Sequence, residues 1–414
     1  MLLAALVPLG CDKGGGADAA DADAVREFDE ATPEPAREAE GPEADAEAEE
    51  AYPYPPAHDA LIPLDGQVLF PVFLDGGTEP SHLVVDTGAG RSAFEESLLR
   101  EVKNGVGQVT IDFGGGILFP DYKVLAVDLS AAENHIGVPI HGLIGQELFA
   151  TLYFSLDYRA SRAHVSTEVP PVPPPGFESG DAIEVPYTVV QTLPLVTVRV
   201  GDTEVTLIAD TGSGVTLVTE SSVPSAILQT GIDGYVWYTS YGSDPAKLVR
   251  LPSLTIAGHE VTDSWAAVVP DDFHLKAVFD GLGVSAVGFV GYPVYRRFHV
   301  AIIAAEERYQ FYPYPDISHL PAFEWDRVGL EVMREQGAVT VDMVFAPSDA
   351  ADQGIATGDV LTAIDGQSLD GMPLDEIRLM LRGAPGETRT LDLERGAAPL
   401  QLEVEVDRLL EPLE

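Results

Sequence analysis

The chain has 414 residues, of which 45% are hydrophobic and 8% aromatic. This is the composition of a globular protein, and the length predicts two to three domains. The 67 Asp and Glu residues far outnumber the 23 Lys and Arg residues, which leaves a net charge of −44. So acidic a chain has no general attraction to nucleic-acid phosphates or to anionic membrane surfaces, and we expect neither as a partner. No stretch approaches 18 consecutive apolar residues, so the sequence predicts no membrane-spanning helix.

The chain contains a single cysteine, Cys11, which excludes a disulfide framework and cysteine-based metal sites. Cys11 ends the apolar run MLLAALVPLGC. This run resembles the signal of bacterial lipoproteins, which is cut before a cysteine that then carries the lipid. The resemblance implies a signal at residues 1–11, lipidation of Cys11, and a location at the bacterial cell envelope. The folded domains would be periplasmic or extracellular, with the lipid anchor as their only membrane contact. The alternative is a frayed apolar N-terminus with a buried cysteine.

The next region, residues 12–60, begins as a strongly acidic segment. Residues 12–50 hold 15 Asp and Glu but only 3 Lys and Arg, a net charge of −12, and Phe28 is their only aromatic residue. Such a segment buries too little apolar surface to offset the entropy lost on ordering. We therefore predict a disordered tether between the signal and the folded domains.

Short apolar runs bounded by Gly, Pro and Asp follow, and they predict β-strands. In the first block these runs are Val68–Phe70, Leu83–Val85, Gln108–Phe113 and Tyr122–Val127. Two Pro-marked connectors divide the remaining chain, because proline cannot continue a helix or a central strand. The predicted regions are a first β block (61–168), a linker (169–180), a second β block (181–312), a second linker (313–325) and a C-terminal domain (326–408).

The two β blocks contain the same motif in the same order. An apolar run precedes Asp86-Thr87-Gly88 in the first block and Asp210-Thr211-Gly212 in the second. Further downstream, each block has two hydrophobic residues followed by Gly, at 143–145 and at 289–291. Average amino-acid usage gives roughly 0.1 Asp-Thr-Gly triplets in a chain of this length. An internal duplication is the economical explanation.

The duplicated motif resembles that of the aspartic proteases, in particular the bacterial retropepsin-like family in which two lobes are fused in one chain. The resemblance implies a mainly β fold in which two retropepsin-like lobes share one cleft. It also implies an endopeptidase that cleaves polypeptides with a catalytic pair, Asp86 and Asp210. Gly88 and Gly212 would permit the tight turns of the two loops. The hydroxyl groups of Thr87 and Thr211 would lock the loops together.

Two neighbouring carboxylates cannot both ionise easily, so the pair would hold one shared proton. The charged member would act as general base on a water molecule, and the protonated member would donate to the scissile carbonyl. This chemistry needs no cofactor and no metal. Ser213 could donate to Asp210, whereas Ala89 cannot donate to Asp86, so the two halves should be chemically unequal. Arg91 stands where a small or hydroxylated residue is expected, and it could perturb the pair or be a solvated side chain.

An aspartic protease also needs a flap that closes over the substrate and excludes water. The sequence offers two candidates, Gly105–Gly116 in the first block and Gly234–Gly242 in the second. The second is rich in aromatic residues, although Trp237 and Tyr238 could equally be packing residues.

The C-terminal domain, residues 326–408, resembles a bacterial PDZ domain, an α+β fold. The resemblance rests on 346–351 (APSDAA), on 354–366 (GIATGDVLTAIDG) and on a helix predicted near 374–382. In such domains a peptide C-terminus adds as a strand, and a Gly-containing loop holds its carboxylate with backbone N–H groups. Val328, Gly329 and Leu330 occupy the place of that loop. The alternative is a folded spacer that binds nothing.

The sequence therefore predicts a lipid-tethered aspartic endopeptidase with a PDZ module for the C-termini of substrates or partners. The competing prediction is a catalytically silent protease fold that acts as a peptide-binding scaffold. His-Glu-x-x-His, Gly-x-Ser-x-Gly and phosphate-loop motifs are absent from the sequence. Zincin, serine-hydrolase and nucleotide chemistry are therefore unsupported.

Overall fold

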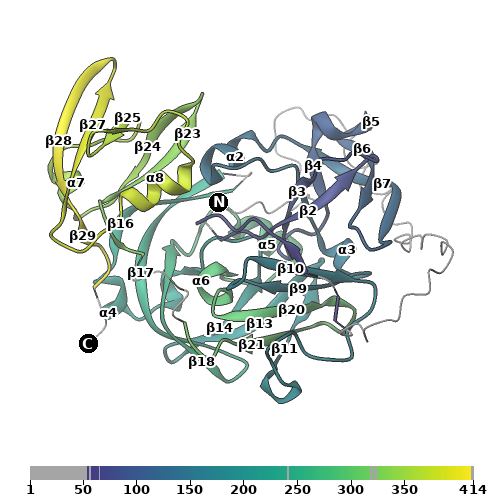
Figure 1. Cartoon of the computed structure of the whole chain (residues 1–414). Helices are drawn as coiled ribbons and strands as arrows, with labels where there is room; N and C mark the ends of the chain where they lie inside the picture. Colours follow the sequence, from purple (N-terminus) through teal and green to yellow (C-terminus); the bar gives the residue numbers. More distant parts are fainter. Residues whose placement is uncertain are drawn as a thin grey trace.

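The structure is a computed structural model that describes residues 54–411, apart from residues 56, 65, 240, 241, 318, 319 and 321–323. Two β lobes are followed by a smaller α+β domain (Figure 1), so the predicted fold class is confirmed. Among the described helices, none has the length and apolar character needed to cross a membrane. The predicted signal, the lipidation of Cys11 and most of the tether lie outside the described residues, and they stay predictions.

Lobe 1 is built on a sheet in which the strand before Asp86 lies beside the strand that ends at Ile144. Two parallel pairs, β3 with β8 and β4 with β7, form its centre. In the chain, helix α2 (Ser130–Ile136) lies between β7 and β8, and α3 (Gln146–Phe149) follows β8. The strand order is β2 (Leu69–Leu74), β3 (Ser81–Val85), β8 (Gly142–Ile144), β4 (Ala93–Glu95), β7 (Leu118–Val127), β6 (Val106–Asp112) and β5 (Arg100–Lys103).

Lobe 2 repeats this strand order and adds one edge strand. Its parallel pairs are β14 with β19 and β15 with β18, in the places of β3/β8 and β4/β7. This correspondence supports the duplication inferred from the sequence. The order is β12 (Thr188–Val190), β13 (Leu193–Val200), β14 (Thr203–Ala209), β19 (Gly288–Val290), β15 (Leu217–Thr219), β18 (His259–Val269), β17 (Gly242–Ile256) and β16 (Ile232–Thr239). Its helices are α4 (Ser225–Leu228), α5 (Lys276–Leu282) and α6 (Tyr292–Tyr295).

A third sheet joins the two lobes, because the lobe 1 strand β9 pairs antiparallel with the lobe 2 strand β20. One hydrophobic core runs across this junction and includes Phe70 and Phe154 of lobe 1 with Phe311 of lobe 2. The lobes therefore share a core. The order of this sheet is β1 (Ala57–Asp59), β10 (Arg162–Ser166), β9 (Tyr153–Asp157), β20 (Phe298–Ile303), β21 (Arg308–Pro313) and β11 (Ile183–Pro186).

The first predicted strand is longer in the structure than its apolar run indicated. The run Val68–Phe70 becomes β2, which continues through Pro71 to Leu74. Proline lacks the N–H group that a central strand needs. It is tolerated because Pro71 pairs with β3, whereas the pairing of β2 with β6 begins only at Phe73. The strand is therefore placed correctly by the sequence, but its end is not.

The C-terminal domain has a separate core, with Val332, Ile364 and Leu391 among its buried side chains. Its helix α8 (Leu374–Met380) is shorter than the predicted 374–382. The strand order is β23 (Leu330–Glu335), β24 (Ala338–Val344), β25 (Val360–Ile364), β27 (Thr388–Arg395) and β28 (Ala398–Glu405). The remaining elements are β22 (Asp326–Arg327), β26 (Gln367–Ser368), β29 (Asp407–Arg408) and α7 (Asp349–Asp352).

The C-terminal domain contacts both lobes. On the side of lobe 2, Asp233 in β16 and Ala346 exchange two backbone hydrogen bonds of 2.9 Å. Trp325 and Phe345 pack into a hydrophobic core of lobe 2. On the side of lobe 1, α2 packs against β23, and Figure 1 shows α2 between the two parts. The domain is therefore docked on the protease-like body.

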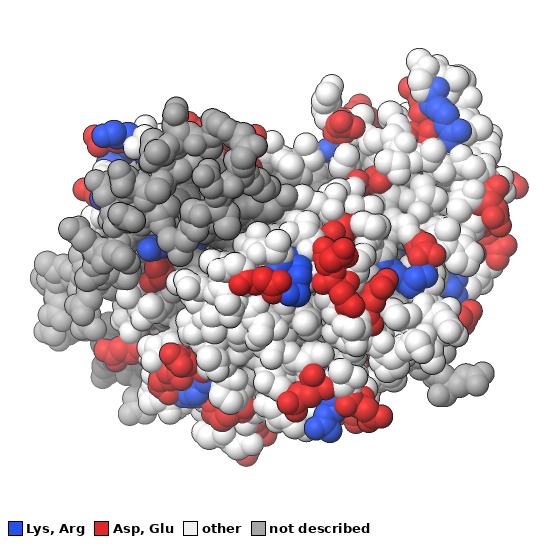
Figure 2. Space-filling view, turned by 180° about the vertical axis from the view of Figure 1, so that it is seen from behind, with Lys and Arg blue, Asp and Glu red and all other residues white. Residues whose placement is uncertain are grey.

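The acidic composition is visible on the surface. Figure 2 shows many Asp and Glu side chains on the face opposite to that of Figure 1, with fewer Lys and Arg side chains between them. Lys and Arg side chains are therefore the minority among the charged residues.

Candidate active site

The two Asp-Thr-Gly loops are held by equivalent strands. The N–H group of Asp86 donates to the carbonyl of Ile144 in β8, and that of Asp210 donates to the carbonyl of Val290 in β19, both at 3.1 Å. The strands with two hydrophobic residues before Gly therefore position both Asp residues. Glycine is required after β19, because a Cβ atom on Gly291 would lie 2.0 Å from a backbone oxygen of lobe 2.

The carboxyl groups of Asp86 and Asp210 face each other, and both residues are completely buried. A Cβ atom on Gly88 would lie 2.4 Å from Cγ of Asp210, and one on Gly212 would lie 2.5 Å from Cγ of Asp86. Each carboxyl group therefore rests against the glycine of the opposite loop. No residue larger than glycine fits at either position without displacing a carboxyl group.

Thr87 and Thr211 lock the two loops together through a symmetrical set of hydrogen bonds. The N–H group of each threonine donates to the hydroxyl oxygen of the other, at 3.1 and 3.0 Å. Each hydroxyl group in turn donates to a carbonyl of the opposite lobe, Thr87 to Ala209 at 2.7 Å and Thr211 to Val85 at 2.6 Å. The expected reach of the threonine hydroxyl groups across the lobes is present in both directions.

The buried carboxyl oxygens have few donors. The N–H group of Gly212 donates to Oδ1 of Asp210 at 2.9 Å. Backbone N–H groups of Gly88 and Ala89 approach Asp86, but among the described residues no donor makes a regular hydrogen bond to either of its oxygens or to Oδ2 of Asp210. Because buried acceptors are costly without a donor, a proton shared between the two carboxyl groups is the economical way to satisfy them.

Burial and mutual repulsion favour this shared proton. Burial, followed by the proximity of Asp210, raises the pKa of Asp86 well above its ordinary value, and burial also raises the pKa of Asp210. The two groups titrate as a pair, so a proton on the pair belongs to neither residue alone. The site therefore keeps one acid and one base to a higher pH than an exposed pair would.

The structure corrects the expectation for Ser213 and places Arg91 more closely. The hydroxyl of Ser213 donates to the carbonyl of Val215 at 2.8 Å and not to Asp210, because the loop turns this side chain back on itself. The expected chemical inequality with Ala89 therefore does not arise through this hydrogen bond. Arg91 is half-buried and lies near Glu147, where burial raises the pKa of the carboxyl group and the charge of Arg91 offsets part of this rise.

The structure gives the two flap candidates different forms. Most of Gly105–Gly116 is the strand β6, whereas Gly234–Gly242 belongs to the long hairpin of β16 and β17. Trp237 in this hairpin is buried, and its ring contacts those of Phe273 and Phe289 at an angle, so it is a packing residue. The ring of Tyr238 lies 6.5 Å from that of His135 on α2. The hairpin thus reaches toward lobe 1, and its action as a flap stays a prediction.

The loop predicted to hold a peptide carboxylate already uses some of its N–H groups. The N–H group of Val328 donates to Leu381, and that of Leu330 donates to Val328, at 2.8 and 2.6 Å. Gly329 lies between them, where a Cβ atom would collide with Ser348 at 2.2 Å. Peptide binding by this loop stays a prediction.

The groove between β23 and α8 is covered by lobe 1. Nη2 of Arg378 in α8 donates to the carbonyl of His135 at 2.7 Å and to the carbonyl of Val332 in β23 at 3.1 Å. Nδ1 of His135 lies 3.4 Å from a carboxyl oxygen of Asp342. A peptide that adds to this edge of β23 must therefore displace α2. No periodicity or motif in the sequence indicated this contact.

Within the described part of the chain, no group of three or more His, Cys, Asp or Glu residues is arranged to hold a metal ion.

The geometry agrees with what comparisons of the sequence with known families find. Residues 196–294, within lobe 2, match a family described as aspartyl protease, and residues 347–395 match a family described as PDZ domain. The chain carries an aspartyl protease domain followed by a PDZ domain. The match includes the Asp210 loop, and the shared topology extends the likeness to lobe 1.

Curated relatives match only a part of the chain. A probable CtpA-like serine protease from Staphylococcus haemolyticus is 30% identical over 77 residues, which is 19% of this chain and 16% of that protein. The carboxy-terminal processing protease CtpB of Bacillus subtilis is 29% identical over 90 residues, 22% of this chain and 19% of that protein. The chain thus spans less than a fifth of the length of these two relatives.

A solved aspartic proteinase from Irpex lacteus aligns with 64% of this chain and 98% of its own, at 12% identity and a TM-score of 0.39. A solved photosystem II D1 C-terminal processing protease aligns with 20% of this chain and 23% of its own, at 22% identity and a TM-score of 0.20.

Proposed function

We propose that this protein is an aspartic endopeptidase in which Asp86 and Asp210 form the catalytic pair. The observation that carries the proposal is the packing of each carboxyl group against the glycine of the opposite loop. A Cβ atom added to Gly88 or Gly212 would lie 2.4 or 2.5 Å from the Cγ atom of the opposite aspartate. This packing makes the two lobes contribute equally to one acid–base centre. The match of residues 196–294 to the aspartyl protease family supports it.

The pair hydrolyses a peptide bond by proton transfer. The ionised carboxylate takes a proton from a water molecule, which attacks the peptide carbon as its carbonyl oxygen receives the proton of the other carboxyl group. The tetrahedral intermediate then breaks down when the amide nitrogen is protonated and leaves. The threonine lock keeps both carboxyl groups in place during this cycle, since each hydroxyl group is bonded to the opposite lobe.

Two features support aspartic rather than serine chemistry, although the curated relatives are named serine proteases. Their aligned segments cover less than a fifth of their own length, so the similarity need not include their reactive centres. The serine next to the pair, Ser213, has its hydroxyl bonded to a backbone carbonyl. It is therefore not arranged as a nucleophile.

The PDZ domain serves, in this proposal, to recognise the C-termini of substrates or partners. The domain contacts both lobes, which supports a role in delivering a bound peptide to the catalytic pair. Because neither Asp86 nor Asp210 is exposed, the groups that cover them must move before a peptide reaches them. The competing function, a silent peptide-binding scaffold, needs no such movement at the pair.

A peptide-library cleavage assay tests the proposal. The purified chain should cleave a proteome-derived library and be inhibited by a transition-state analogue of aspartic proteases. Asp86→Asn and Asp210→Asn should each abolish cleavage, because each removes half of the pair. The control is Asp280→Asn, which changes an exposed aspartate of α5 that pairs with Lys276 at the surface. Full activity in either pair variant would refute Asp86 and Asp210 as the catalytic pair. Absence of cleavage by the unaltered chain would favour the competing function of a peptide-binding scaffold.

We further propose that lipid on Cys11 holds the protein at the bacterial cell envelope. The support is the apolar run before Cys11 and the acidic segment after it. Cys11→Ser should move the protein from the membrane fraction to the soluble fraction. A variant that still sediments with membranes would contradict the anchor.

A further inference from the structure

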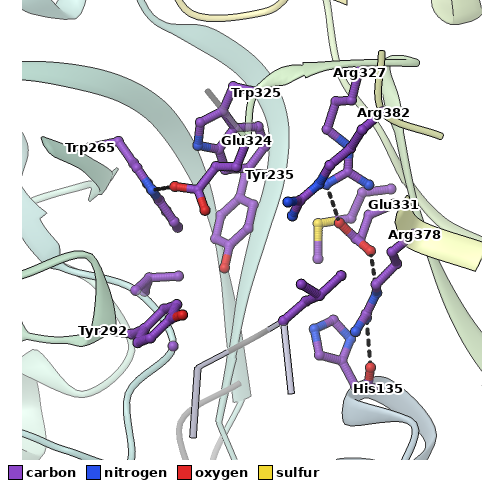
Figure 3. A pocket seen from close by; sticks show the side chains of 14 residues that line it. His135, Tyr235, Trp265, Tyr292, Glu324, Trp325, Arg327, Glu331, Arg378 and Arg382 are labelled. Carbon is purple, nitrogen blue, oxygen red and sulfur yellow. Dashed lines mark hydrogen bonds and ion pairs between the residues drawn. The ribbon is translucent and has the colours of Figure 1, made fainter. Parts of the chain in front are cut away.

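A pocket lies where the PDZ domain meets the two lobes. Lobe 2 contributes Gly214 and Val215, which directly follow the Asp210 loop, together with several aromatic side chains. The PDZ domain contributes Arg327, Arg378 and Arg382. Figure 3 shows these arginines on one side of the pocket and the aromatic residues Trp265, Trp325, Tyr235 and Tyr292 on the other.

Both carboxylates that line the pocket are paired with arginines. Glu331 lies 2.9 Å from Arg327 and 2.7 Å from Arg378. Glu324 receives two hydrogen bonds of 2.8 Å from Arg296 and a further one from the indole of Trp265. Both carboxylates are thus occupied by other side chains, and the pKa values of both are lowered by these arginines in spite of burial.

The guanidinium group of Arg382 takes no part in these ion pairs. Its Nε and Nη1 atoms are buried and have no hydrogen-bond partner among the described residues. Burial, followed by repulsion from Arg327, lowers the pKa of Arg382, although the nearby carboxylates of Glu324 and Glu331 act in the opposite direction. The surroundings therefore compensate its charge only in part. In Figure 3 its guanidinium group points into the pocket. Buried guanidinium nitrogen atoms that make no hydrogen bond to the described residues are unusual, above all in a chain with a net charge of −44.

The chemistry of this pocket suits one carboxylate next to an apolar side chain. A planar guanidinium binds a carboxylate with two parallel hydrogen bonds, and such charge-assisted bonds are strong where water is excluded. Tyr235, Trp325 and Met343 line the same pocket and can receive an apolar group. The C-terminal residue of a peptide combines these two features.

The pocket is also close to the catalytic pair. Gly214 is four residues after Asp210, so its Cα atom lies at most about 14 Å from that of Asp210. An extended peptide rises about 3.3 Å per residue, and about four residues cover this distance. A peptide whose last carboxylate lies in the pocket could therefore place a bond only a few residues upstream at the pair.

We propose that Arg382 binds the free C-terminal carboxylate of the peptide substrate in this pocket. This site differs from strand addition at β23, where α2 and Arg378 cover the edge. The inference deepens the proposed function, because it names the residue and the pocket that receive the C-terminus. It rests on that function only for the cleavage step, since binding can be measured without cleavage.

The test measures binding in the full chain carrying Asp210→Asn, so that no peptide is cleaved. Three fluorescein-labelled hexapeptides serve as probes: one ending in leucine with a free acid, the same peptide as an amide, and an amide ending in glutamate. Fluorescence anisotropy should show at least about tenfold tighter binding of the acid than of either amide. Arg382→Gln should remove this difference, and Arg382→Lys should retain a part of it because the charge is kept.

Arg199→Gln is the matched control, since Arg199 is exposed on β13, and it should leave the acid preference unchanged. Thermal unfolding of each variant checks that it is folded. Equal binding of acid and amide, an unchanged preference in Arg382→Gln, no measurable binding of the acid, or equal binding of the glutamate amide would each overturn the proposal. Cleavage without an acid preference would refute this inference alone, whereas an acid preference without cleavage would refute only the peptidase.

Discussion

The two lobes are nearly identical at their centres and different at their edges. Their Asp-Thr-Gly loops share strand contacts, threonine hydrogen bonds and close glycine packing. At the edge, lobe 1 has the short strands β5 and β6, whereas lobe 2 has the long hairpin of β16 and β17, on which the PDZ domain docks. In the proposed function, the duplicated centre would perform the chemistry, and the unequal edges would decide where a substrate binds.

The strongest test of central symmetry is the replacement of the two facing glycines. Gly88→Ala and Gly212→Ala should each lower kcat/KM roughly a hundredfold or more, because the new Cβ atom displaces a carboxyl group of the opposite lobe. Gly281→Ala is the control, since it lies in α5 with open space around its Cβ position. Steady-state peptide cleavage gives the result, and a large loss in only one of the two variants would break the symmetry.

The edges should differ where the centres agree. Gly234 in β16 and Gly105 in the turn between β5 and β6 both have a positive φ, so alanine strains the backbone at both. Only at Gly234 would Cβ also collide, 2.1 Å from the carbonyl oxygen of Val344 in the PDZ domain. Gly105→Ala should therefore cost about 1 kcal/mol and Gly234→Ala about 3 kcal/mol of unfolding free energy. Denaturant unfolding measures both, and equal costs would show that the docking contact contributes nothing.

The pH dependence of stability tests the like-charge repulsion at the centre. The folded protein raises the pKa values of Asp86 and Asp210, so above the ordinary value of 3.8 the folded state binds more protons than the unfolded state. The free energy of unfolding should therefore fall as pH rises from about 4 through the raised values. Asp210→Asn removes this loss and should be at least about 1 kcal/mol more stable than the unaltered chain at pH 7.

The same variant should lose its advantage at about pH 3 and below, where the two carboxyl groups are mostly protonated in the folded and in the unfolded state. Asp86→Asn should behave alike, because it relieves the same repulsion. Asp280→Asn, on the exposed surface of α5, is the control and should show no such change with pH. A gain that is constant from pH 3 to pH 8 would contradict a raised pKa at the pair.

Local sequence signals were sufficient for the centre and insufficient for the edges. The Asp-Thr-Gly triplets and the hydrophobic-Gly strands lie in the same order in both lobes, so the pairing of Asp86 with Asp210 could be predicted. The contact of Arg378 with the carbonyl of His135 joins residues that are 243 positions apart. Because every residue has a backbone carbonyl, the sequence does not indicate which one an arginine will contact. Arg382 was overlooked for a similar reason, since an arginine after a helix looks like a solvated side chain until its surroundings are known.

Ser213 shows how fine the remaining difference between the centres is. Ser213→Ala gives the Asp210 loop the residue that the Asp86 loop has at Ala89. Because its hydroxyl donates to Val215 and not to Asp210, the change should lower the unfolding free energy by about 1 kcal/mol. It should also change kcat/KM by less than about threefold and leave the pH profile of kcat in place. Had the hydroxyl donated to Asp210, its loss would raise the pKa of the pair and shift that profile to higher pH. A pH–rate profile of Ser213→Ala decides between the two arrangements, and an unshifted curve means that the loops remain chemically equivalent even though their sequences differ.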